Sequence, residues 1–124
     1  MRYLLDTNII VALTIQADKN VVRHAGNCDA GELVTSSIAL AEVALGSERG
    51  QPPTMDALRE FLEEVPVLDF DEKAALAYAL IPFKRASFDR LIAAHALSRE
   101  LVIVTGNEKD FADVPGLRVE NWTQ

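Results

Sequence analysis

The chain has a single cysteine, Cys28, so no disulfide bond can form within it. We therefore expect a protein of the reducing cytoplasm, where disulfide bonds are rare. Long apolar runs are also lacking, because Asp6, Glu42 and Lys84 interrupt the apolar stretches well short of a membrane span. Asp6 and Asn8 likewise break the apolar segment that a signal peptide would need. These absences argue against a membrane protein and against a secreted one.

Basic residues are in the minority, with 12 Lys and Arg against 19 Asp and Glu, for a net charge of -7. This balance argues against a protein that binds nucleic acid through a broad basic face. It suits an enzyme whose excess acid holds divalent cations, because a bound metal reverses the local field. The length of 124 residues and the 49% of hydrophobic residues indicate an ordinary folded protein. We expect residues 1–124 to form a single domain.

Short apolar segments alternate with helical patterns along the whole chain. They predict five strands, at Arg2–Leu5, Leu33–Thr35, Pro66–Leu68, Leu101–Val104 and Leu117–Glu120. They also predict six helices. Two are defined by their N-caps, which are Asn8 for the first helix and Ser36 or Ser37 for the third. The others are expected at Lys19–Ala25, Met55–Val65, Asp71–Leu80 and, after a Ser87 cap, Phe88–Arg99. Apolar strands joined by helices indicate an α/β fold, a central, mostly parallel sheet of about five strands between two helical layers. The β-branched run at 101–104 is the expected central strand.

Three acidic residues stand where a folded chain has difficulty keeping a charge. Asp6 follows an apolar run, Glu42 is the only charge within residues 38–45, and Asp89 opens an apolar helix pattern. A carboxylate moved out of water costs several kcal/mol, so it is kept only with a proton, an ionic partner or a metal. Three such residues in one small domain suggest a shared cation.

The expected sheet brings these acids toward one edge. Ligands of parallel α/β sheets bind beyond the carboxyl ends of the strands, where the strand order reverses. Asp6 and Thr105 each follow a predicted strand, and Asp89 lies in the first turn of a predicted helix. Mg²⁺ and Mn²⁺ take oxygen ligands, and such ions can orient a phosphodiester and lower the pKa of a bound water. We expect Asp6, Glu42 and Asp89 to bind Mg²⁺ or Mn²⁺. Asn8 and Thr105 would form hydrogen bonds with these ligands or with metal-bound waters.

Two of these acids also have an ordinary structural interpretation. Glu42 would then pair with Arg90 or Arg49, and Asp89 would be a simple acid at a helix N-terminus. The basic residues that flank Asp89 are candidates for contacts with substrate phosphates, or else form a solvated cluster: Lys84, Arg85 and Arg90.

Three further side chains near this segment are expected to be structural. Phe83 and Phe88 are more often core residues than platforms on which nucleobases stack. His95 lies off the face of Asp89 on the same predicted helix, which does not favour a catalytic role.

Five segments of the chain are similar to one known family. The sequence resembles the PIN-domain ribonucleases, in particular the VapC-type toxins of bacterial toxin–antitoxin pairs. The resemblance lies in LLDTNII at 4–10, SSIALAEVALG at 36–46, SFDRLIAAHAL at 87–97, IVTGNEKDF at 103–111 and VPGLRVENW at 114–122, in the family's order. Each segment is short, and together they are specific.

The resemblance implies a PIN-like three-layer α/β/α sandwich and a metal-dependent endoribonuclease that inhibits growth or translation. Asp6, Glu42 and Asp89 would match the family's first, second and third metal-binding acids. The implied cofactor is Mg²⁺ or Mn²⁺. The implied partners are an RNA substrate, a small cognate antitoxin and a second copy of the chain, with higher-order assembly on the antitoxin.

The chain departs from the family in two places. Many relatives place a fourth acid just after the strand that ends near Thr105, and this chain has Asn107 there. Asp110, three residues later, either approaches the site or only caps a turn. The span between Asp71 and Asp89 is also short, so substrate selection is expected to differ.

Two rival functions fit part of the pattern. A phosphatase of the haloacid-dehalogenase type would use Asp6 as nucleophile, but it wants a second acid where Asn8 stands. A catalytically weak PIN-like module that only binds a partner is favoured by Asn107 and by the acidic pI of about 4.7.

Overall fold

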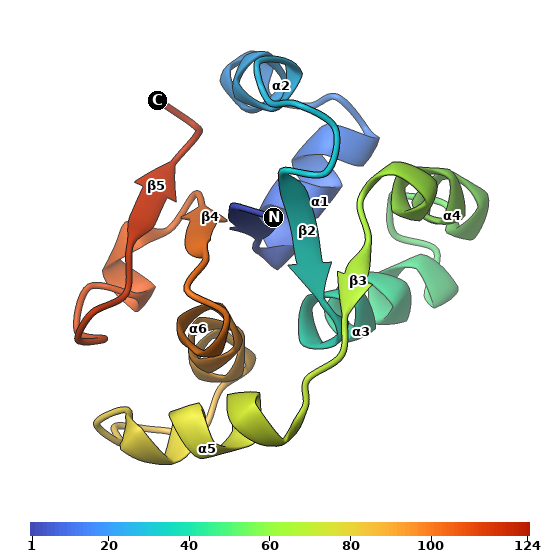
Figure 1. Cartoon of the computed structure of the whole chain (residues 1–124). Helices are drawn as coiled ribbons and strands as arrows, with labels where there is room; N and C mark the ends of the chain where they lie inside the picture. Colours follow the sequence, from blue (N-terminus) through green and yellow to red (C-terminus); the bar gives the residue numbers. More distant parts are fainter.

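A computed structural model describes residues 1–124 as five strands, six α-helices and one short 3₁₀ helix (Figure 1). The strands are β1 Tyr3–Leu5, β2 Leu33–Ser36, β3 Val67–Leu68, β4 Val102–Thr105 and β5 Val119–Asn121. The helices are α1 Thr7–Thr14, α2 Lys19–Gly26, α3 Ser37–Glu48, α4 Met55–Glu64, α5 Glu72–Leu80, α6 Phe88–Ser98 and the 3₁₀ helix η1 Glu108–Asp110. None of these helices has the length and apolar character needed to cross a membrane.

All strand pairs are parallel, and the strands lie in the order β3-β2-β1-β4-β5. Leu4 in β1 is in register with Val34 in β2 on one side and with Ile103 in β4 on the other. The predicted five-stranded parallel sheet is therefore confirmed. The middle position belongs to β1, and the β-branched β4 lies beside it with all four residues buried.

Helices cover both faces of the sheet because the chain crosses it in two directions. The helices α1 to α4 lie in the connections that lead from β1 to β2 and on to β3. The helices α5 and α6 lie in the connection that returns the chain to β4, and they pack along each other (Figure 1). Parallel crossovers are almost always right-handed, so opposite directions place the two groups on opposite faces. The strand order reverses between β1 and β4.

One apolar core joins the sheet to its helices. Leu4, Leu5 and Ile103 of the inner strands are fully buried, as are Ile9 and Ile10 of α1. Burial of each such side chain contributes about 1.5–3 kcal/mol.

The first helix starts two residues earlier than the sequence predicts. Asp6, and not Asn8, is the N-cap of α1, because its carboxylate accepts a 2.8 Å hydrogen bond from the backbone N–H of Thr7. Asn8 is exposed inside the helix. The caps of α3 and α6 agree with expectation, with the hydroxyls of Ser36 and Ser87 as acceptors. The first acid of the proposed site thus also has a local structural task.

His95 ties α6 to the start of α3. Its side chain is fully buried, and Nδ1 lies 2.7 Å from Oγ of Ser36, the N-cap of α3. The ring meets the edge of Phe70, with 5.5 Å between centroids. Burial lowers the pKa of His95 and favours the neutral imidazole. His95 is therefore a core residue, in agreement with its expected structural role.

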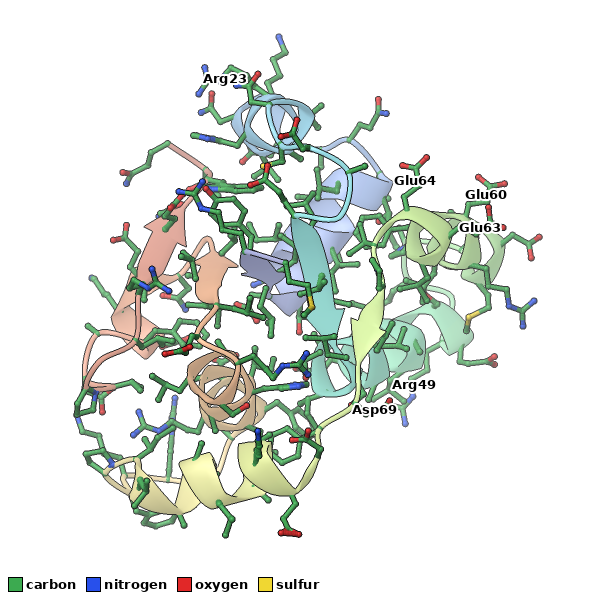
Figure 2. The ribbon with its side chains drawn as sticks, in the orientation of Figure 1. Arg23, Arg49, Glu60, Glu63, Glu64 and Asp69 are labelled. Atoms are coloured by element: carbon green, nitrogen blue, oxygen red, sulfur yellow. The ribbon has the colours of Figure 1, made fainter.

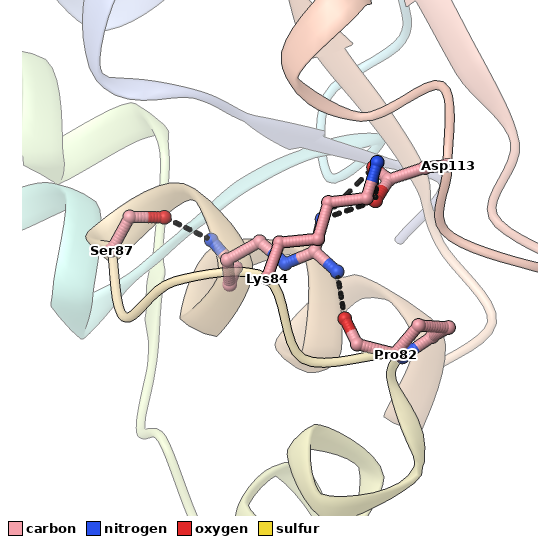
Figure 3. A network of polar contacts seen from close by, with 5 residues as sticks. Pro82, Lys84, Ser87 and Asp113 are labelled. Atoms are coloured by element: carbon pink, nitrogen blue, oxygen red, sulfur yellow. Dashed lines mark hydrogen bonds and ion pairs between the residues drawn. The ribbon is translucent and has the colours of Figure 1, made fainter.

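Arg90 fixes the start of α6 to two loops (Figure 3). Its guanidinium is buried and donates to both carboxylate oxygens of Asp113, at 2.9 and 3.0 Å, and to the carbonyl oxygen of Pro82. The exposed Lys84 also reaches Asp113, with 3.3 Å between Nζ and Oδ2. The hydrogen bond from Arg90 lowers the pKa of Asp113. Arg90 is thereby committed to the fold.

We expect Arg90→Ala to lower the free energy of unfolding by about 2–3 kcal/mol, because charge-assisted hydrogen bonds at a buried group are lost. Urea denaturation followed by circular dichroism measures this change. Lys84→Ala is the matched control, since it removes the exposed partner of the same Asp113, and it should cost about 0.5 kcal/mol or less. Equal losses in the two variants would contradict a structural role specific to Arg90.

Candidate active site

Asp6 sits at the point where the strand order reverses. Its side chain is only 4% exposed, and it follows β1 directly. Oδ1 accepts from the backbone N–H of Thr7 at 2.8 Å, and Oδ2 accepts from the hydroxyl of Thr105 at 2.9 Å. The backbone N–H of Asp6 donates to the carbonyl oxygen of Val104. The ends of β1 and β4 therefore fix both oxygens of this carboxylate.

Glu42 reaches the same place from α3. The hydroxyl of Thr7, the residue after Asp6, donates a 2.8 Å hydrogen bond to Oε1 of Glu42. The ion pairs that would have explained Glu42 structurally are not formed, since Arg90 pairs with Asp113 and no ion pair includes Glu42 or Arg49. A neutral hydroxyl, and no cation, thus orients the second acid.

Asp89 and Asp110 line one cavity beside these residues. Asp89 projects from the first turn of α6, and Asp110 ends η1. The cavity has a volume of about 290 Å³ and only polar or charged walls: Lys84, Arg85, Ser87, Asp89, Arg90, Lys109, Asp110 and Asp113. Of the two possibilities for Asp110, the structure has the one in which it approaches the site.

Asn107 supports the site by holding Asp110. Its amide Nδ2 donates to Oδ2 of Asp110 at 2.6 Å, and its backbone N–H donates to the hydroxyl of Thr105 at 3.0 Å. The same hydroxyl donates to Asp6. The asparagine at the family's fourth acidic position therefore orients a nearby acid in place of being one.

Burial and neighbouring carboxylates raise the pKa values of Asp6 and Asp89. Burial is the largest cause of the raised pKa of Asp6, and the charges of Glu42 and Asp110 add to it. Burial also comes first for Asp89, followed by the charge of Asp6 and the contact with Asp110, and together these raise its pKa to about 6. Asp6 and Asp89 are therefore harder to ionise than exposed carboxyl groups, because they are buried and lie close to other carboxylates.

This donor set fits a divalent cation that keeps part of its water shell. No three Asp, Glu, His or Cys side chains lie close enough together to enclose one ion. Mg²⁺ in enzymes usually takes one or two carboxylates, with waters and substrate phosphate as its other ligands. Asp89 and Asp110 in the wall of the polar cavity, with Asp6 and Glu42 close to Asp89, offer carboxylate oxygens for such an ion, and nitrogen or sulfur ligands are not offered.

The basic residues near Asp89 differ in their availability. Lys84, Arg85 and Lys109 are exposed along the cavity wall. Arg90 was also a candidate for substrate phosphates, but its guanidinium is buried and bound to Asp113 and Pro82. Lys109 lies next to Asp110 on η1, and its place in the cavity follows from the three-dimensional fold and from no sequence pattern.

Part of the negative charge lies away from this cavity. Figure 2 shows Glu60, Glu63 and Glu64 on the outer side of α4, where they point away from the sheet. All three are exposed. The net charge of -7 is therefore a poor guide to the field at the acids near α6.

Comparisons with known proteins identify the family of the chain. A family model described as PIN domain matches residues 3–117. The "tRNA(fMet)-specific endonuclease VapC" of Shigella flexneri is 36% identical in an alignment of 132 positions that covers 99% of each chain. "Ribonuclease VapC2" of Haemophilus influenzae is 31% identical and covers 98% of each chain.

Solved structures give the same result. A chain of DNA-bound VapBC from Salmonella typhimurium aligns with a TM-score of 0.86 at 31% identity, over 98% of both chains. A chain of VapBC2 from Rickettsia felis, bound to a promoter DNA fragment, aligns with a TM-score of 0.87 at 28% identity, over 98% of this chain and 99% of that one. The family model and the relatives span nearly the whole sequence. The chain belongs to the PIN domain family, in its VapC-type group of ribonucleases.

Proposed function

We propose that the chain is a metal-dependent endoribonuclease that cleaves RNA phosphodiester bonds with activated water, as the toxin of a toxin–antitoxin pair. The observation that carries the proposal is the meeting of Asp6, Glu42, Asp89 and Asp110 without any cationic partner. A fold keeps such repelling carboxylates when a ligand of opposite charge offsets the repulsion.

Each residue of the site has a distinct part in this proposal. Asp6, Glu42 and Asp89 would hold Mg²⁺ or Mn²⁺, with Asp110 as a further oxygen ligand. When bound, the ion would orient the phosphodiester, lower the pKa of a water and stabilise the leaving oxygen. Thr105 keeps Asp6 in place, and the exposed cations of the cavity would bind the RNA phosphates on either side: Lys84, Arg85 and Lys109.

A phosphatase that uses Asp6 as nucleophile is less well supported. Asn8, at the position of the second acid in such enzymes, is exposed within α1. A module that only binds a partner would not need a fourth acid, and Asp110 supplies one.

The proposal extends to substrate, partners and location. The name of the Shigella relative suggests tRNA as the class of RNA to test first, in the cytoplasm. The VapBC complexes support a small antitoxin that binds the toxin. A toxin homodimer and larger assemblies with the antitoxin are the further part of the proposal. The biological result would be inhibited translation and arrested growth.

Asp89→Asn should reduce metal-dependent RNA cleavage by about 100-fold or more, because several kcal/mol of charge stabilisation depend on the ion. Cleavage of purified tRNA with Mg²⁺ or Mn²⁺, followed by mapping of the RNA ends, measures the effect. Asp56→Asn, the same change on the exposed first turn of α4, is the control and should leave cleavage intact. EDTA should abolish wild-type cleavage, and added Mn²⁺ should restore it. A folded Asp89→Asn protein with undiminished activity would refute the assignment.

Asn107→Ala should raise the Mn²⁺ concentration needed for half-maximal cleavage by about tenfold, because loss of a residue that orients a ligand typically costs that much metal affinity. Asp110→Asn should have an equal or larger effect, since it removes the carboxylate itself. Activity measured over a Mn²⁺ titration tests both variants. Unchanged titration curves would exclude Asp110 from the metal site.

In the metal-free protein, Asp89 should contribute less stability as the pH rises. Folding raises the pKa of Asp89 from 3.8 to about 6, so its contribution to the free energy of unfolding falls between those two values. His95 acts in the opposite direction, because its pKa is lowered. The informative quantity is therefore the difference between wild type and Asp89→Asn. Relative to the variant, wild type in EDTA should lose a few degrees of Tm from pH 4.5 to pH 7 (about 2–5 °C), and Mg²⁺ should restore them. Parallel pH curves would contradict the raised pKa.

A further inference from the structure

Two phenylalanines that the sequence assigns to the core lie at the surface. Phe83 is 75% exposed and Phe88 is 53% exposed. Phe88 is the first residue of α6 and immediately precedes Asp89. An exposed aromatic ring does not gain the free energy that its burial would provide. An exposed ring next to an acidic site is therefore a candidate for contact with a ligand.

Phe88 lines a cavity of its own. This second cavity has a volume of about 330 Å³, and its other walls are Tyr78, Ala86, Ser87 and Leu91. All of these except Ser87 are apolar or aromatic. We call it the Phe88 cavity, to distinguish it from the acidic cavity that contains Asp89 and Asp110.

The two cavities are neighbours. Ser87 lines both of them, and Phe88 and Asp89 follow one another on the same helical turn. Lys84 and Arg85, three and two residues before Ser87, face the acidic cavity. An apolar hollow with an aromatic wall therefore adjoins a polar hollow that has acids and cations.

A nucleotide has the same division of properties. Its base is flat, with a face that stacks on aromatic rings, and its phosphate is anionic and binds cations or metals. Proteins that bind single-stranded nucleic acid combine basic groups along the backbone with aromatic side chains on which bases stack. Paired bases do not offer that face, and RNA is read mainly where its bases are unpaired.

We propose that the Phe88 cavity binds one unpaired nucleobase of the RNA, stacked on Phe88, next to the phosphate that occupies the acidic cavity. This inference rests on the proposed ribonuclease function and assigns the single-stranded part of its substrate. A protein segment bound over the same ring is the competing explanation. It accounts for the apolar cavity alone, whereas a nucleotide accounts for both cavities and for the cations of the acidic one.

Binding of RNA by proteins that do not cleave it provides the first test. In an Asp89→Asn background with Mg²⁺, a short single-stranded RNA containing 2-aminopurine should bind with quenching of its fluorescence. Addition of Phe88→Ala should weaken binding about tenfold and remove the quenching, because stacking on one side chain contributes that order of affinity per base. Phe88→Trp should retain both. Phe83→Ala is the matched control, because Phe83 is a more exposed ring, in the loop that precedes α6, and does not line the Phe88 cavity.

Cleavage of RNA that lacks a single base provides the second test. In the otherwise wild-type enzyme, Phe88→Ala should raise KM for intact single-stranded RNA about tenfold. At one position beside the cleaved bond, an abasic nucleotide should cause a similar rise in wild type and no further rise in the variant. Such non-additivity between ring and base identifies a direct contact.

The outcomes separate this inference from the proposed function. Equal RNA binding, quenching and KM for Phe88→Ala and wild type would overturn the base site and assign the ring to a protein contact. Losses that are the same with and without the base would overturn it as well. Absence of cleavage by wild type would refute the proposed function, while Phe88-dependent binding and quenching would still support the base site. Thermal melting of both phenylalanine variants checks that each remains folded.

Discussion

The hydrogen bond from Thr105 Oγ1 to Asp6 Oδ2, 2.9 Å long, joins β1 to β4 where the strand order of the sheet reverses. Parallel strands on either side of such a point diverge into helices on opposite faces, which leaves a crevice above it. The same carboxylate caps α1, and the next residue, Thr7, orients Glu42. The position of the site is thus set by a side chain that the fold itself requires.

The neutral character of these hydrogen-bond donors determines what the site needs. Hydroxyl and backbone N–H groups satisfy the geometry of Asp6 and Glu42 but do not neutralise their charges. Asp113 shows the alternative, because Arg90 and Lys84 complete its ion pairs and its pKa is lowered. The pKa values of Asp6 and Asp89 are raised instead. Asp113 and Asp89 line the same cavity. Only the carboxylates without an ion pair leave negative charge for an external cation.

Local pattern predicts much of this molecule, and the failures have physical causes. The strands and most helix N-caps can be predicted from residue types, because apolar runs and the serines that precede helices determine the structure of their own segment. Asp110 and Lys109 reach the cavity through the turn of η1, which periodicity does not describe. Phe88 continues the apolar stripe that includes Ile92 and His95, yet it stands at the first turn, where the ring remains 53% exposed. An apolar stripe identifies the buried face of a helix, but it does not show at which residue the packing over that face ends.

The segment between α5 and α6 connects stability to substrate choice. Arg90 binds the carbonyl of Pro82 and the carboxylate of Asp113, so it holds this segment against the start of α6 (Figure 3). Because of these contacts, Arg90 is not available to bind RNA, but they keep Lys84 and the Phe88 cavity beside Asp89. The acids define which bond chemistry is possible, and they say little about sequence or structure of the RNA. We therefore propose that discrimination among RNAs depends on this short segment.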